Sequence, residues 1–113
     1  MQVLKFGGTS VGQPHRMHQI GDLITRDEVL KIVVLTALSG TTNTLVQVCD
    51  QLSKGHLSKA SETLAQLRVH YKQFVEDLLE GEIQKVKVIS FLNEHFDFLQ
   101  RQANSVKIKR MRF

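Results

Sequence analysis

The sequence predicts an α/β fold in which two parallel strands, each followed by a helix, precede an antiparallel hairpin of two long helices. Three observations carry this prediction. Two short apolar runs end in loops rich in glycine and hydroxyl groups, and each loop leads into a helical pattern. The second half of the chain then keeps a heptad-like spacing of apolar residues. Short connections between alternating strands and helices favour parallel pairing of the strands.

The first strand is predicted over residues 2–6, and it would be buried on both faces if Val3, Leu4 and Phe6 all pointed into a core. Pro14 suits the first turn of the helix that follows, because backbone N–H groups there have no acceptor within the helix and proline lacks this N–H. This helix should extend to about Arg26. Its apolar face is predicted from the spacing of Met17, Ile20, Leu23 and Ile24.

The second strand is predicted over residues 31–36, where β-branched and apolar residues follow one another. A loop over residues 37–40 leads into a second helix, for which Gly55 is a suitable stop. The predicted apolar face of this helix consists of Leu45, Val46, Cys49 and Leu52.

Two further helices are predicted on either side of Gly81, and they should pack as an antiparallel hairpin. We interpret this pair as structural rather than as a coiled coil for a partner. The first seam consists of Leu57, Ala60, Leu64, Leu67, Tyr71, Phe74 and Leu78. The second consists of Val86, Ile89, Leu92, Phe96, Leu99 and Ala103.

Composition and charge exclude several classes of protein. The net charge is +4, but four of the 15 basic residues lie in residues 104–113, which leaves 11 basic against 11 acidic residues elsewhere. The basicity therefore belongs to this tail, and we expect no nucleic-acid partner. Neither a membrane span nor a signal peptide is visible, so we expect no membrane partner. A single cysteine, Cys49, fits a packing role and a cytoplasmic location.

We divide the chain into residues 1–55, which hold the strands and both loops, residues 56–103, which form the hairpin, and the basic tail over residues 104–113. The tail alternates apolar and basic residues as a strand would, and this alternation ends at Arg110. A strand, a frayed end and a truncated or non-native end all remain open for it.

A candidate phosphate site follows the first strand. Gly7 and Gly8 allow positive φ and let an anion approach backbone N–H groups, while the following helix offers the positive end of its dipole. Lys5 adds a full positive charge before the glycines, and Ser10 adds a hydroxyl after them. A common strand-to-helix turn is the alternative interpretation of the same residues.

A second loop rich in hydroxyl side chains follows the second strand. The stretch from Thr36 to Asn43 contains four hydroxyl side chains, an amide and a glycine, and it opens a helix whose N-cap would be Thr41, Thr42 or Asn43. In an open parallel sheet, ligands bind beyond the carboxyl ends of the strands. For the second loop alone, turn and cap roles for Ser39, Thr41 and Thr42 are an equally good interpretation. Two such loops at adjacent strand ends favour a shared site.

These residues carry a resemblance to a known family. The stretch Lys5-Phe-Gly-Gly-Thr-Ser-Val-Gly12, followed by Val33-Val-Leu-Thr-Ala-Leu-Ser-Gly-Thr-Thr-Asn-Thr-Leu45, resembles the start of aspartate kinase, a member of the amino-acid-kinase superfamily. The match is strong over residues 2–48 and only architectural over residues 56–103. The resemblance implies the start of a three-layer domain with a parallel sheet.

The resemblance also implies an activity: transfer of the γ-phosphate of ATP, bound with Mg²⁺, to the β-carboxylate of L-aspartate. This gives aspartyl phosphate, the first step toward lysine, threonine and methionine. By position, Lys5 would be the catalytic residue, which stabilises the transferring phosphoryl group, and it would bind nucleotide phosphate together with Gly7, Gly8 and Ser10. The aspartate would be bound by Thr36, Ser39 and Thr42. No residue is assigned to a metal, and His15 and His18 are interpreted as a solvated helix face.

Several departures limit what the resemblance implies. Thr36 occupies a position that is usually serine, and the downstream Gly-Glu motif and nucleotide half of the family have no match. We do not transfer the role of that glutamate to Glu82. We therefore expect this chain to be inactive alone and to associate with itself, whereas the full enzyme would be a homo-oligomer. The alternative is a small α/β module that binds an anion or a partner without catalysis.

Overall fold

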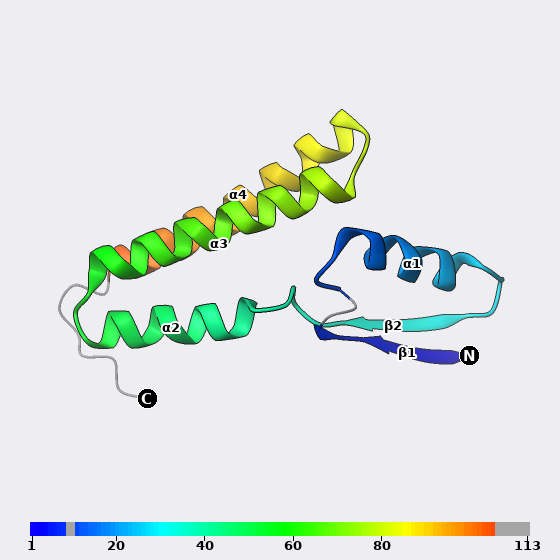
Figure 1. The fold of residues 1–113 in the computed structure, drawn as a ribbon, viewed down its shortest axis with the longest axis horizontal. Helices are drawn as coiled ribbons and strands as arrows, with labels where there is room; N and C mark the ends of the chain where they lie inside the picture. The colour runs from blue at the N-terminus through cyan, green and yellow to red at the C-terminus, as the bar shows by residue number, and fades with distance from the viewer. Residues whose placement is uncertain (9–10, 106–113) are drawn as a thin grey trace. The chain divides into compact units, whose positions relative to one another are not determined.

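The computed structural model describes residues 1–8 and 11–105, which form two strands and four helices (Figure 1). Two compact units divide between Thr41 and Thr42. The division of the chain after residues 55 and 103 stays a prediction. The α/β class is confirmed as a mostly helical chain with a two-stranded parallel sheet. In order, the elements are β1 (Gln2–Phe6), α1 (Pro14–Thr25), β2 (Lys31–Leu35), α2 (Thr41–Ser53), α3 (Leu57–Leu78) and α4 (Glu82–Ser105).

The first unit is a β-α-β arrangement. Strands β1 and β2 pair in parallel from Gln2 opposite Lys31 to Phe6 opposite Leu35, which confirms the predicted strand pairing. The expectation that β1 is buried on both faces is wrong, because Val3 is 66% exposed. Side chains alternate across a strand, so Val3 lies on one face while Phe6 lies on the other, where it borders a cavity with Ile20 of α1. Helix α1 thus covers one face of β1.

The loop between α1 and β2 is held by a charged contact. Asp27 accepts a hydrogen bond from the backbone N–H of Val29 at 2.9 Å and forms an ion pair with Lys31, the first residue of β2. The Lys31 ammonium also donates to the carbonyl oxygen of Val29 at 3.0 Å. The hydrogen bond from Lys31, followed by that from Val29, holds the pKa of Asp27 below its ordinary value. This contact lies at the point where β2 begins.

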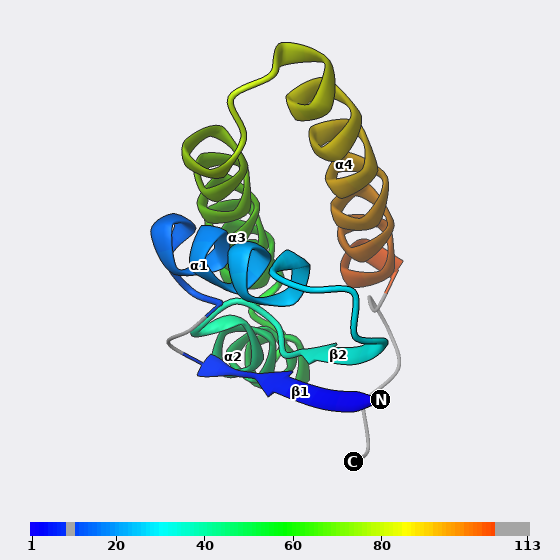
Figure 2. The same ribbon diagram turned by 90° about the vertical axis from the view of Figure 1, so that its right-hand side faces the viewer.

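The second unit contains the predicted antiparallel hairpin of α3 and α4, which lie side by side (Figure 2). Leu64 of α3 is 2% exposed and belongs to a cluster with Val48, Ala60 and Ala103, against which Leu52 and Leu99 pack. The heptad-like seam of α3 is confirmed by its buried residues, which are Ala60, Leu64, Leu67, Phe74 and Val75. Val75 was not predicted.

Two helices bury other residues than the sequence predicts. Val86 of α4 is 66% exposed, and Lys85 takes the seam position instead, with its ammonium 3.1 Å from the Glu76 carboxylate. In α2, Val48 is the residue that reaches the core, whereas the predicted Val46 is exposed and Leu45 borders solvent. A helix that carries apolar residues on two sides leaves the choice of buried face to its packing partners.

Polar contacts also join the hairpin. Arg68 of α3 donates to Asn93 Oδ1 through Nε at 3.2 Å and through Nη2 at 2.8 Å, and its Nη1 lies 2.9 Å from Asp97 Oδ1. Gln100 and Ser61 form a second contact through the Ser61 hydroxyl at 3.1 Å. These bonds fix the register of α4 against α3.

Among the described residues, no helix is long and apolar enough to cross a membrane. Ser105 ends α4, so from residue 106 onward the predicted basic tail lies outside the described residues.

Candidate functional site

The two loops singled out in the sequence leave the same edge of the sheet. Phe6 and Leu35 are paired as the last residues of β1 and β2, and the N–H of Thr36 donates to the carbonyl oxygen of Phe6 at 3.1 Å. Parallel pairing therefore places Gly7 and Thr36 next to each other just beyond the strand ends. This is where ligands bind in open parallel sheets.

A hydrogen bond links the first loop to the second. Gly8 has a φ of +46°, which favours glycine, and its N–H donates to Thr36 Oγ1 at 3.2 Å. The Thr36 hydroxyl in turn donates to the carbonyl oxygen of Ala37 at 3.3 Å. The Thr36 side chain also lies against Gly7, since a Cβ added there would be 3.4 Å from Thr36 Cγ2. The sequence predicted both loops but not this bond.

The loops meet again at Gly12, which the sequence analysis did not assign to the site. A Cβ added at Gly12 would lie 2.9 Å from Ser39 Cβ, closer than real Cβ atoms come to a neighbour. Glycine at this position therefore permits the close approach of Ser39. Gly12 is the third glycine of residues 5–12, and this position was the signal that could have indicated its role.

Lys5 lies on the sheet face that α1 does not cover. It is exposed, and it pairs with Val34 one position before the last pair of the sheet. The alternation of β1 places Lys5 on the same face as Val3 and opposite Phe6. A lysine here carries its charge on a flexible stem of four carbons, long enough to reach past the strand end.

The second loop turns sharply before α2 begins. Gly40 has a φ of +86°, and the N–H of Thr41 donates to the carbonyl oxygen of Leu38 at 3.1 Å. Thr41 is buried, with 8% of its surface exposed. Helix α2 begins at Thr41, so the predicted N-cap candidates Thr41, Thr42 and Asn43 all lie inside its first turn. Ser39 is exposed on the turn itself.

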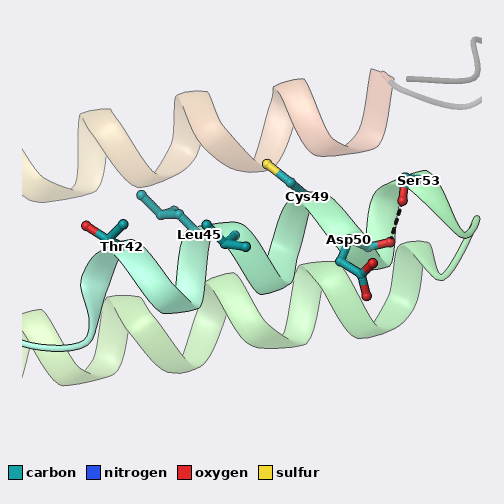
Figure 3. Close-up of a pocket in the computed structure, with 6 residues that line it drawn as sticks. Thr42, Leu45, Cys49, Asp50 and Ser53 are labelled. Atoms are coloured by element: carbon teal, nitrogen blue, oxygen red, sulfur yellow. Dashed lines mark hydrogen bonds between the residues drawn. The ribbon is translucent and has the colours of Figure 1, made fainter. Parts of the chain in front are cut away.

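Thr42 belongs to the second unit, where it lies at one end of an open groove along α2 (Figure 3). The groove has a volume of about 500 Å³, and its walls are mainly apolar. Cys49 is half-buried there, and the Ser53 hydroxyl donates to the carbonyl oxygen of Asp50 at 2.8 Å. The lining residues are Thr42, Leu45, Val46, Cys49, Asp50 and Ser53.

Sequence predictions also concern Ser10, His15 and His18. Ser10 lies outside the described residues, so its expected role in phosphate binding stays a prediction. His15 and His18 are exposed on α1. In residues 1–8 and 11–105, no three histidine, cysteine or acidic side chains come together as a metal site would require.

The fold and the linked loops define an α/β protein with a glycine loop and a hydroxyl loop at adjacent strand ends.

No family model matches the chain. It is 28% identical to "Lysine-sensitive aspartokinase 3" of Escherichia coli (strain K12), over 78% of this chain and 21% of that protein. It is 32% identical to "Aspartokinase 1, chloroplastic" of Arabidopsis thaliana, over 81% of this chain and 16% of that protein.

A shorter match reaches higher identity. The chain is 44% identical to "Aspartokinase" of Rickettsia conorii (strain ATCC VR-613 / Malish 7), over 45% of this chain and 14% of that protein. The chain is therefore a relative of the aspartokinases, which confirms the resemblance of its loop motifs. The chain spans about a fifth or less of the length of these relatives. Matches over 78% and 81% of the chain also reach beyond residues 2–48 into the helical hairpin, where the sequence motifs predict only an architectural likeness.

Proposed function

We propose that this chain supplies the phosphate loop and the aspartate loop of an aspartate kinase. The reaction transfers the γ-phosphoryl group of ATP to the β-carboxylate of L-aspartate, which gives ADP and aspartyl phosphate. The observation that carries the proposal is the hydrogen bond from Gly8 to Thr36, because it joins the two loops at the carboxyl ends of paired strands. The aspartokinase names of the relatives support the choice of reaction.

In this proposal the first loop stabilises charge. Phosphoryl transfer needs positioning and electrostatic stabilisation more than a protein nucleophile. Lys5 neutralises charge that develops on the transferring group, while Gly7 and Gly8 offer backbone N–H donors to the phosphates. Ser10 is proposed to add a hydroxyl donor. ATP brings Mg²⁺ through its own phosphate oxygens, as is usual for this ion.

The second loop holds the acceptor in this proposal. Thr36 and Ser39 present hydroxyl groups beyond β2, and Thr42 follows in the first turn of α2. Hydroxyl donors to the aspartate would orient its β-carboxylate toward the γ-phosphate, which lowers the entropic part of the barrier. Aspartate and ATP are thus proposed as small-molecule partners in a cytoplasmic enzyme.

The proposal extends to the architecture of the whole enzyme. The described strands form a two-stranded sheet, and Val3, Ile32 and Val34 are exposed on one face of it. In a three-layer domain, further strands and helices would cover this face and the open strand edges. We propose that the 113 residues alone give no turnover and associate with themselves, and that the full enzyme is a homo-oligomer.

A chimeric enzyme tests the proposal. Residues 2–48 of this chain replace the aligned segment of the Escherichia coli relative, and ADP release is measured with ATP, Mg²⁺ and L-aspartate, with hydroxylamine present to trap aspartyl phosphate. We expect activity in the chimera. We expect Lys5→Ala in the same chimera to lower kcat about 100- to 1000-fold, the effect typical of removing one donor to a transition-state charge.

Arg26→Ala serves as the control, since this exposed residue follows α1 and lies outside both loops. A soluble, folded chimera without aspartate-dependent ADP release contradicts the proposal. It would favour the alternative, a module that binds an anion or a partner without catalysis. A Lys5→Ala chimera with unchanged kcat would contradict the catalytic role of Lys5.

A further inference from the structure

The Gly8 amide already has an acceptor in this structure, and the acceptor comes from the other loop. Its N–H donates to Thr36 Oγ1 at 3.2 Å. A backbone N–H directs a single hydrogen along one line, so it makes one well-aligned bond at a time. An anion oxygen that uses the Gly8 donor must therefore replace the Thr36 hydroxyl.

We propose that Thr36 is a positioning residue that occupies the Gly8 amide while the loop is empty and releases it when phosphate binds. This inference rests on the proposed function, because it takes the competing ligand to be the phosphate chain of a nucleotide. The exchange is favourable because a hydrogen bond to a charged oxygen is stronger than one to a neutral hydroxyl. Thr36 is exposed, so water satisfies its hydroxyl after the exchange.

The shape of Thr36 suits it to hold the amide. Its Cγ2 lies 3.4 Å and its Oγ1 3.5 Å from the position of a Cβ added at Gly7, so the side chain rests against the loop backbone. A β-branched side chain has few χ1 rotamers, which keeps the hydroxyl directed at Gly8. The bond ties Gly8 to the second loop. It also weakens phosphate binding, because the ligand must first displace the hydroxyl.

The test is a titration of the isotope-labelled 113-residue chain with inorganic pyrophosphate at constant ionic strength. The amide resonances of Gly7 and Gly8 report binding at the loop. We expect Thr36→Val, which keeps the shape but removes the acceptor, to bind pyrophosphate about two- to tenfold more tightly than the unaltered chain, as expected for loss of one competing hydrogen bond. Thr36→Ser, which keeps the acceptor, should change the affinity less than Thr36→Val.

Thr25→Val is the matched control, because the Thr25 hydroxyl bonds to the Gly21 carbonyl oxygen within α1. We expect it to leave the affinity unchanged. Equal or weaker binding by Thr36→Val, with pyrophosphate still shifting Gly7 and Gly8, overturns this inference and leaves the phosphate loop standing. If pyrophosphate shifts neither amide in any of these proteins, the inference fails together with the phosphate site on which it rests.

Discussion

At the scale of single residues, the site depends on glycines that permit contacts between loops. Gly12 admits Ser39 at a distance that no side chain would allow, and Gly8 adopts a positive φ that turns its N–H toward Thr36. The sequence predicts Gly7, Gly8 and Thr36 as site residues from residue type and order. It could not identify the pairing of Gly12 with Ser39, because a contact between residues 27 positions apart depends on the register of the two strands.

We expect Asp27 to make the first unit sensitive to pH. Its pKa is lowered in the folded chain, mainly by the hydrogen bond from Lys31 and then by that from Val29. The contact therefore stabilises the fold above the pKa of the unfolded state, about 3.9, and this stabilisation is lost as the pH falls through the lower folded value. We expect hydrogen-exchange protection of the Gln2 amide, which donates to the Leu30 carbonyl oxygen, to fall between pH 5 and pH 3.

The variant Asp27→Asn separates this contact from the other carboxylates. It should show lower protection of Gln2 at pH 5 and little further loss at pH 3, while protection of hairpin amides matches the unaltered chain. An equal loss of protection in both proteins would show that Asp27 is not the responsible group.

At the scale of elements, α4 shows where periodicity alone fails. The spacing predicted Val86 in the seam, but Lys85 lies there, with 16% of its side chain exposed and Glu76 as its partner. Counting apolar residues overlooks a lysine that buries its stem and pairs its charge. The remaining seam residues were predicted because leucine, isoleucine and phenylalanine repeat at heptad spacing.

Arg68 should contribute measurably to the hairpin, because its planar guanidinium bonds to both Asn93 and Asp97 of α4. Lysine carries the same charge but cannot reproduce this fork. We expect Arg68→Lys to destabilise the hairpin by about 1 kcal/mol, a value reduced by partial solvent exposure. Urea unfolding followed by circular dichroism should show a lower midpoint, whereas Arg101→Lys, at an exposed position of α4, should leave it unchanged. Equal midpoints for all three proteins would contradict this role for Arg68.

At the scale of the whole molecule, the order of elements was predictable and the set of buried faces was not. Strand and helix bounds follow from local signals such as Pro14, Gly55 and the β-branched run of β2. Which side of α2 is buried depends on α3 and α4, and it is Val48 rather than Val46 that packs there. The loop motifs indicated the family because their residue types and spacing resemble those of aspartate kinase, whereas the bond that joins the loops required coordinates.

We propose above all that nucleotide phosphates bind at the loop after β1. Titration of the isotope-labelled chain with ATP and Mn²⁺, a paramagnetic substitute for Mg²⁺, tests it directly, because amides near the metal-bound phosphates lose intensity even when binding is weak. We expect the resonances of Gly7, Gly8 and Thr36 to broaden first, and Lys5→Ala to reduce the effect. Broadening confined to the α2 groove, or none at the glycines, would contradict the claim.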